Sequence, residues 1–264
     1  MSRFLQDTAV EPVGAGTYEA RIDRGWWIER GPNGGYLAAI VLRAIIAEVD
    51  DPTRRPRSIT LHFLRPPVEG PCEVLVVPER AGRGMTTVSA RLRQDGRDCI
   101  LAIAALGVDR IAPSIDDQEA PRVEAPDALV TPPADPRVTI PIRDRYEQRP
   151  ALGSRPFEAG EEAVTGGWIR TTDDDPVDEV LLAALTDAWP PAVFARLGGP
   201  TGVPTVDLTI HFRHAPPGVP GWSLVRFRTA VLTDGYLEED GEVWSADGLL
   251  LAQSRQLAVV LTPG

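Results

Sequence analysis

The stretch SITLHF at residues 58–63 recurs as DLTIHF at residues 207–212, and this repeat decides how the chain is organised. Each copy is followed by a Pro-Pro pair and later by an Asp-Gly turn: Pro66-Pro67 and Asp95-Gly96 in the first half, Pro216-Pro217 and Asp247-Gly248 in the second. Asp-Gly between alternating apolar residues is a strong signal for a β-hairpin. The repeat therefore predicts two similar halves, each ending in an antiparallel meander.

An apolar helix is predicted before each meander. In residues 35–49 the apolar side chains recur at helical spacing, and residues 177–188 carry a similar stripe that Pro190-Pro191 ends. One helix and one curled antiparallel sheet, occurring twice, indicate the α+β class.

Residues 111–137 separate the two halves and are rich in Pro, Asp and Glu, with little periodicity. We interpret them as a linker that crosses the surface. The expected organisation is a first domain at residues 1–110, the linker, and a second domain at residues 138–264.

Composition excludes several classes of function. The formal charge is −11, which argues against nucleic acid as a partner, because such binding depends on neutralising phosphates. All 27 basic residues are Arg, so a Lys Schiff base and a Walker A lysine are excluded. No apolar run is long enough to span a membrane, and residues 1–8 lack the order of a signal peptide. We therefore expect a cytoplasmic protein that contacts neither nucleic acid nor membrane.

Several motifs, in order along nearly the whole chain, resemble the acyl-CoA thioesterase II family of double hot-dog thioesterases. They are PNGG (32–35), SITLHFLRP (58–66), EQRP (147–150), GWIR (167–170), LAALTD (182–187), TVD (205–207) and AQSRQ (252–256). The resemblance implies a double hot-dog, with two antiparallel sheets each wrapped around a central helix. It also implies hydrolysis of fatty acyl-CoA by a water molecule that an Asp, a Ser or Thr, and a Gln hold in place. These family residues correspond here to Asp187, Thr205 and Gln256.

Each of the three site residues also has a structural interpretation. Asp187 lies near the C-terminal end of the second helix, where the helix dipole disfavours negative charge, so it is either functional or an exposed residue of a last turn. Thr205 is an ordinary residue for a strand start. Strand alternation places Gln256 on the face with small residues and Gln253 on the face with Arg255, so Gln256 is the inward amide, either functional or only a satisfied buried group.

Asn33, Gly34 and Gly35 open the first helix and are candidate substrate-binding residues. Their backbone N–H groups could contact a thioester carbonyl or a phosphate, and the alternative is close packing at a helix start. Aligning the halves puts Ala39 near the position of Asp187, Ala104 opposite Gln256, and Pro56 or a nearby residue opposite Thr205. These first-half residues are all apolar, so we expect the catalytic set in the second half alone.

The predicted function is an acyl-CoA thioesterase that needs no metal and no organic cofactor. No G-x-S-x-G motif is present, which argues against a serine hydrolase. The alternative is a catalytically silent acyl-CoA-binding or lipid-binding protein with the same groove. Pairing into a homo-oligomer, a dimer of double hot-dogs, is also expected.

Overall fold

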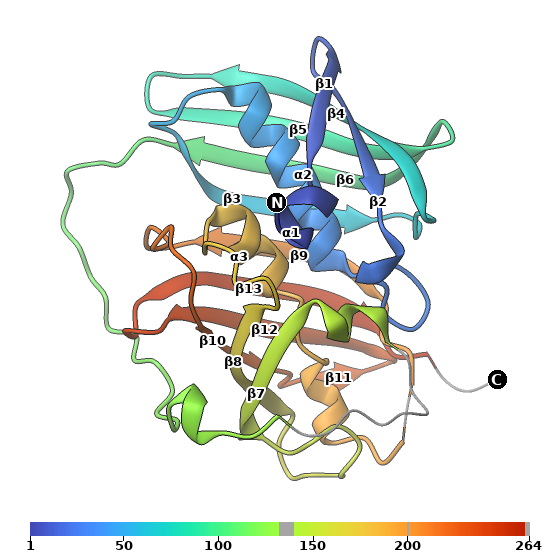
Figure 1. Cartoon of the computed structure of the whole chain (residues 1–264), viewed down its shortest axis with the longest axis vertical. Helices are drawn as coiled ribbons and strands as arrows, with labels where there is room; N and C mark the ends of the chain where they lie inside the picture. The colour runs from blue at the N-terminus through green and yellow to red at the C-terminus, as the bar shows by residue number, and fades with distance from the viewer. Residues whose placement is uncertain (132–139, 200, 262–264) are drawn as a thin grey trace.

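The computed structural model describes residues 1–131, 140–199 and 201–261, and antiparallel strands dominate it (Figure 1). The first half contains α1 (Arg3–Asp7), β1 (Val10–Gly14), β2 (Thr17–Ile22), η1 (Arg24–Trp26), α2 (Gly34–Val49), β3 (Arg55–Phe63), β4 (Gly70–Ala81), β5 (Met85–Gln94) and β6 (Arg97–Gly107). The short 3-10 helices η2 (Pro126–Ala128) and η3 (Pro141–Asp144) follow. The second half contains β7 (Tyr146–Gly153), β8 (Val164–Thr171), α3 (Glu179–Leu185), η4 (Ala192–Ala195), β9 (Thr205–Phe212), β10 (Ser223–Arg228), β11 (Leu232–Thr233), β12 (Tyr236–Ser245) and β13 (Leu250–Val259).

The two halves share one continuous sheet. Within the described residues the strand order is β1-β2-β4-β5-β6-β3-β9-β13-β12-β10-β8-β7, with β11 paired to β12. The expectation of two separate sheets is therefore wrong, because β3 and β9 are hydrogen-bonded neighbours and join the halves edge to edge. Since β3 and β9 carry the two copies of the repeat, the repeat itself forms this junction, which we call the seam.

The register of the strands shows that the two halves have matching strand pairings. At the seam Thr60 is paired with Thr209, and their hydroxyl oxygens lie 3.0 Å apart. Thr60 is also opposite Ile103 of β6, and Thr209 is opposite Arg255 of β13. Each of these strand pairs has a register shift near its start, after Pro56 in one half and before Ala258 in the other. These matching pairings make the two halves comparable residue by residue.

Both helices expected from the sequence are present. Helix α2 is capped by Asn33, whose side chain accepts a hydrogen bond from the Tyr36 N–H, and it is buried along most of its length. Helix α3 is shorter than expected: Asp178 caps its start, and the regular turns end at Leu185, before Thr186 and Asp187. The two helices pack against each other beside the seam (Figure 1).

The segment that follows the first half packs on the outer face of the second. Ala120, Val123 and Leu129 lie against a small cluster that includes Trp168 and Trp244, and the Trp168 indole N–H donates to the Glu124 carbonyl at 2.8 Å. The expected domain boundary at residues 137 and 138 falls outside the described residues.

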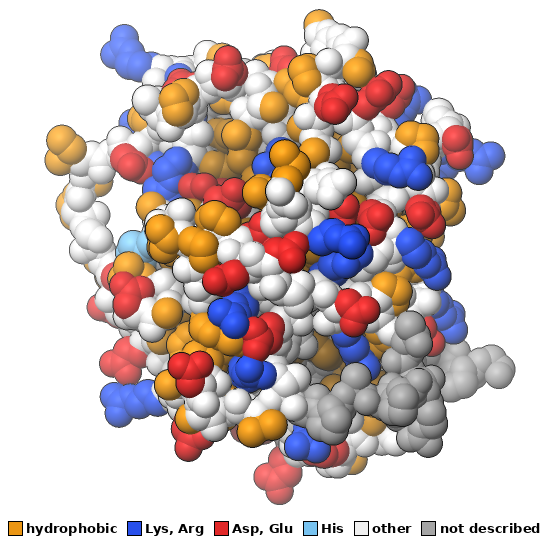
Figure 2. Space-filling view, in the orientation of Figure 1, with side chains coloured by type: hydrophobic (Ala, Val, Ile, Leu, Met, Phe, Trp, Pro, Cys, Tyr) orange, Lys and Arg blue, Asp and Glu red, His pale blue; other side chains and the backbone are white. Residues whose placement is uncertain are grey.

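Arg and acidic side chains alternate over the face drawn in Figure 2, with no single basic patch on it. In the part of the chain that the structure describes, no helix is long and apolar enough to cross a membrane.

Candidate active site

The carboxylate of Asp187, a residue of the second half, lies at the N-terminal end of helix α2 in the first half. Its Oδ2 atom accepts hydrogen bonds from the Gly35 backbone N–H at 3.0 Å and from the Asn33 side-chain Nδ2 at 2.9 Å. Asn33 Nδ2 also donates to the Asp187 carbonyl at 2.7 Å. Helix N-termini favour anions through their free N–H groups and their dipole. The site is therefore built by both halves, with the acid from one and its hydrogen-bond donors from the other.

Gly34 and Gly35 allow the helices to come this close. A Cβ atom on Gly35 would lie 2.4 Å from the Ala184 carbonyl oxygen, and one on Gly34 would lie 3.0 Å from Asp187 Oδ2. The close-packing interpretation is thus realised at Gly35, and the Gly35 N–H is already bonded to the carboxylate. Asn33 and Gly35 hold the acid in this structure, and a direct role of residues 33–35 in substrate binding stays a prediction.

Thr205 and Gln256 belong to a chain of hydrogen bonds that crosses the inner face of the sheet. The Thr205 hydroxyl donates to Gln256 Oε1 at 2.7 Å, and Gln256 Nε2 donates to Glu239 Oε1 at 2.8 Å. The second oxygen of Glu239 accepts the backbone N–H of Ala192. Glu239 was not predicted from the sequence as a member of the site.

Burial sets the charge state of the two carboxyl groups. It raises the pKa of Asp187 to about 6, although hydrogen bonds from Gly35, Gln256, Gly34 and Asn33 act to lower it. Burial also raises the pKa of Glu239 to about 7, and the nearby charge of Asp187 raises it further, against bonds from Ala192 and Gln256. A carboxyl with a pKa near neutrality is suited to exchange protons with water.

Two members of this constellation lie nearer the surface than the others. Asp187 and Thr205 are partly exposed residues, whereas Asn33, Glu239 and Gln256 are 4%, 4% and 5% exposed. The arrangement can therefore present one basic oxygen and one hydroxyl to a reacting molecule, while buried amides keep both in place.

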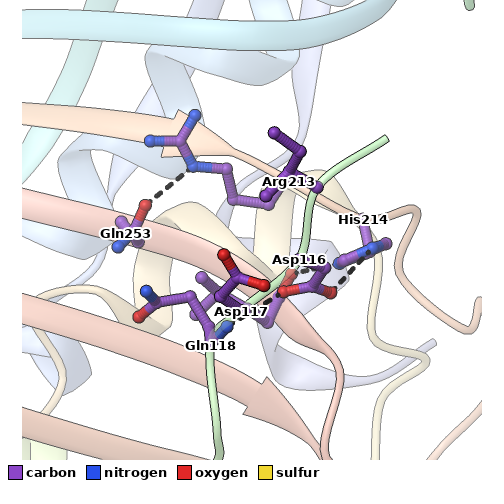
Figure 3. Close-up of a pocket in the computed structure, with 8 residues that line it drawn as sticks. Asp116, Asp117, Gln118, Arg213, His214 and Gln253 are labelled. Atoms are coloured by element: carbon purple, nitrogen blue, oxygen red, sulfur yellow. Dashed lines mark hydrogen bonds and ion pairs between the residues drawn. The ribbon is translucent and has the colours of Figure 1, made fainter. Parts of the chain in front are cut away.

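The side chains of Gln256 and Gln253 point to opposite faces of β13, as predicted. Gln256 lies in the core, while Gln253 accepts a hydrogen bond from Arg213 Nε at 2.8 Å in a surface pocket (Figure 3). That pocket lies on the other face of the strand and is also lined by Asp116, Asp117 and Gln118 of the connecting segment. Gln253 therefore has no place in the constellation around Asp187.

The first half has apolar residues at every position that corresponds to this polar set. The matched registers align Pro56 with Thr205, Ala104 with Gln256, and Val88, which is paired with Ala104, with Glu239. Counting from the N-terminal caps of the two helices corrects the expected equivalence of Ala39 and Asp187. Asp187 lies nine positions after its cap Asp178, and Leu42, not Ala39, lies nine positions after Asn33. Leu42, Val88 and Ala104 are fully or almost fully buried.

Strand alternation was a signal that could have identified Glu239. In β12 the buried positions Leu237, Glu239, Gly241 and Val243 alternate with more exposed ones. A carboxylate on the inward face of an otherwise apolar strand needs a partner, and its cross-strand neighbour is Gln256.

Comparisons with known proteins give matches over most of the chain. Residues 23–107 match the profile of the acyl-CoA thioesterase N-terminal domain, and residues 124–260 match that of the acyl-CoA thioesterase C-terminal domain. An uncharacterized protein of Mycobacterium tuberculosis is 26% identical, over 92% of this chain and 90% of that protein.

Two solved structures are similar along their full length. A conserved protein of unknown function with hot-dog fold from Alicyclobacillus acidocaldarius superposes with a TM-score of 0.90, at 28% identity, covering 100% of both chains. A candidate thioesterase II from Thermobifida fusca superposes with a TM-score of 0.85, at 29% identity, covering 99% of this chain and 98% of that one.

Proposed function

Because this chain belongs to the acyl-CoA thioesterase family, we propose that it hydrolyses acyl-CoA to a free acid and CoA, with Asp187, Thr205 and Gln256 as the residues that hold and activate water. Thioester hydrolysis is the general activity to which the family and the double hot-dog fold point. The acyl-CoA substrate and the roles of the three residues are the specific part of the proposal.

In the proposed mechanism a water molecule bound at Asp187 attacks the thioester carbonyl carbon. Asp187 accepts a proton from this water, which is a step that general bases accelerate about 10²–10⁴-fold. Thr205 and Gln256 orient the water by hydrogen bonds. The proton then passes to the leaving sulfur, so that the C–S bond breaks and CoA departs as a thiol. These steps use only water, the acyl-CoA and the side chains named here.

One observation carries the proposal. Asp187 accepts hydrogen bonds from Asn33 Nδ2 and Gly35 N at Oδ2, so the acid is held in a fixed direction and neither of these bonds occupies its Oδ1 atom. A fixed carboxylate with a pKa of about 6 is mostly ionised at pH 7, and it can accept a proton from water there.

The test is an assay of purified protein against acyl-CoA of several chain lengths, reading free thiol and, in parallel, binding by calorimetry. We expect the wild-type protein to release thiol over multiple turnovers and the Asp187→Asn variant to lose this activity. Tight binding without thiol release would favour the alternative, a catalytically silent acyl-CoA-binding or lipid-binding protein.

We also propose that the chains pair, as a dimer of double hot-dogs. The outer face of the sheet exposes large apolar side chains on three strands, at Val77, Ile103 and Leu257. Sedimentation equilibrium should give twice the chain mass, and a monomer at micromolar concentration would refute this pairing.

A further inference from the structure

Glu239 is a buried carboxylate with both oxygens bonded to donors. It lies on β12, is 4% exposed, and accepts the Ala192 N–H at Oε2 and the Gln256 Nε2–H at Oε1. A carboxylate buried without a positive partner is unfavourable for folding. A specific role therefore has to explain its presence next to Gln256.

The hydrogen bonds around Gln256 have a defined direction. An ionised carboxylate can only accept, so the Gln256 amide must turn its NH₂ group toward Glu239 and its carbonyl oxygen toward Thr205. The NH₂ group has a second hydrogen. Gln256 is also among the groups that lower the pKa of Asp187.

We propose that Glu239 is a positioning residue, whose ionised carboxylate fixes the Gln256 amide so that its second N–H faces Asp187 and the attacking water. The inference rests on the proposed thioesterase function and adds a fourth residue to it. Glu239 itself acts through Gln256 and does not contact the water.

The internal repeat supports this role independently. The position that corresponds to Glu239 in the first half is Val88, and its neighbour Ala104 corresponds to Gln256. Both first-half residues are buried and apolar, so the fold does not require a carboxylate there. The carboxylate occurs in the half that also has the amide and Asp187.

The charges around Glu239 raise its pKa, so that its ionisation falls near neutral pH. Asp187 faces it from the end of α3 and raises its pKa, and the adjacent Asp240 has the same effect, although Arg255 and Arg228 hold Asp240 in ion pairs. Burial is the largest cause and brings the pKa of Glu239 to about 7. A protonated Glu239 would carry its hydrogen on Oε1, because Oε2 faces the Ala192 N–H. That hydrogen would oppose the Gln256 NH₂ group and turn the amide over.

The variant Glu239→Gln tests the inference. Its amide oxygen can still accept the Ala192 N–H, and its NH₂ group then faces Gln256 and favours the turned amide. We expect kcat for acyl-CoA to fall about tenfold to 10²-fold, with KM changed less than about twofold and the thermal unfolding transition retained. The matched control is Glu242→Gln on the same strand, whose side chain pairs with Arg226 outside the site. Equal kcat values in the two variants would overturn the inference.

A measurement on the unmodified protein covers the case in which Glu239→Gln fails to fold. If both carboxyls must be ionised, log kcat should fall with a slope of about two per pH unit well below pH 6, and one ionisation would give a slope of about one. Loss of thioester absorbance is the readout, since it does not depend on thiol ionisation. A wild-type slope of one would overturn the role of Glu239 while leaving the thioesterase proposal intact. If the wild type hydrolyses no acyl-CoA, both proposals fail together.

Discussion

Asp187 Oδ2 lies 3.0 Å from the backbone nitrogen of Gly35, although 152 positions separate the two residues in the chain. This contact explains why a carboxylate follows the C-terminal end of α3, where its own helix dipole is unfavourable. The start of α2, a helix of 16 residues, faces the same carboxylate with free N–H groups and the opposite end of a dipole. The electrostatic penalty of one helix is thus offset by the other.

Replacing Asp187 by Asn should lower kcat by about 10²-fold or more while the protein stays folded, because the base is lost and the shape is kept. Thiol release from acyl-CoA and circular dichroism are the measurements. Asp174→Asn, in the exposed turn before α3, is the matched control and should behave as wild type. Near-normal turnover in folded Asp187→Asn protein would remove Asp187 from the mechanism.

The two glutamines of β13 should respond differently to truncation. Gln256→Ala breaks the bonds to Thr205 and Glu239 and should reduce turnover strongly, by about 10-fold or more. Gln253→Ala removes an exposed bond to Arg213 and should leave turnover within about twofold. Steady-state kinetics on both variants decide the matter, and a larger effect at Gln253 would contradict the proposed site.

Gly35→Ala should destabilise the protein by about 1–3 kcal/mol and reduce activity, because its Cβ would lie 2.4 Å from the Ala184 carbonyl oxygen and push α2 away from α3. Urea unfolding and the turnover number give the two effects. Gly198→Ala is the control, since a Cβ there meets nothing within 4 Å. Unchanged stability in Gly35→Ala would mean that the helices can separate without loss.

Asp187 should make the protein less stable as pH rises. Its folded-state pKa of about 6 lies above the usual aspartate value of 3.8, so the folded state binds a proton more tightly than the unfolded state between these values. The unfolding free energy of Asp187→Asn minus that of wild type should therefore increase from about pH 4 to about pH 6 and then level off. Denaturant titrations of both proteins across this pH range measure the difference in unfolding free energy. A difference that stays constant with pH would show that the pKa of Asp187 is not raised. Activity has the opposite dependence, since the base must be ionised.

Each chain should bind about one molecule of a non-hydrolysable acyl-CoA analogue productively, because the first half has Leu42, Val88 and Ala104 where the second half has polar residues. Calorimetric titration gives the stoichiometry. Two equivalent sites per chain would defeat this asymmetric model, and so would activity that survives the loss of Asp187, Thr205 and Gln256 together.

Much of the fold could be predicted from local patterns. The repeat, the Asp-Gly turns and the helical spacing located both meanders and both helices, and strand alternation separated Gln256 from Gln253. These signals depend on a residue's immediate neighbours in sequence, which is why they can be read without a structure.

Pairings between distant segments were harder to predict. Periodicity gives each half a sheet but does not state that β3 joins β9, so two sheets were expected in place of one. The contact of Asn33 with Asp187 joins two helix ends from different halves, and no local pattern encodes it. Glu239 is a different case, because the alternation of β12 places it on the inward face of the strand and this signal is local in the sequence.

The seam also sets the order in which the chain can fold during synthesis. Thr60 and Thr209 are 149 positions apart, so at about 5–20 residues per second the ribosome delivers β9 roughly 7–30 s after β3. Until then β3, paired with β6 on one side, has an unpaired edge on the other, and such edges attract other chains. Its outward-facing positions Ser58, Thr60 and His62 are polar, and Arg55 and Arg57 precede them. These residues give the nascent first half a hydrophilic edge, which limits its association with neighbouring nascent chains before its own second half arrives.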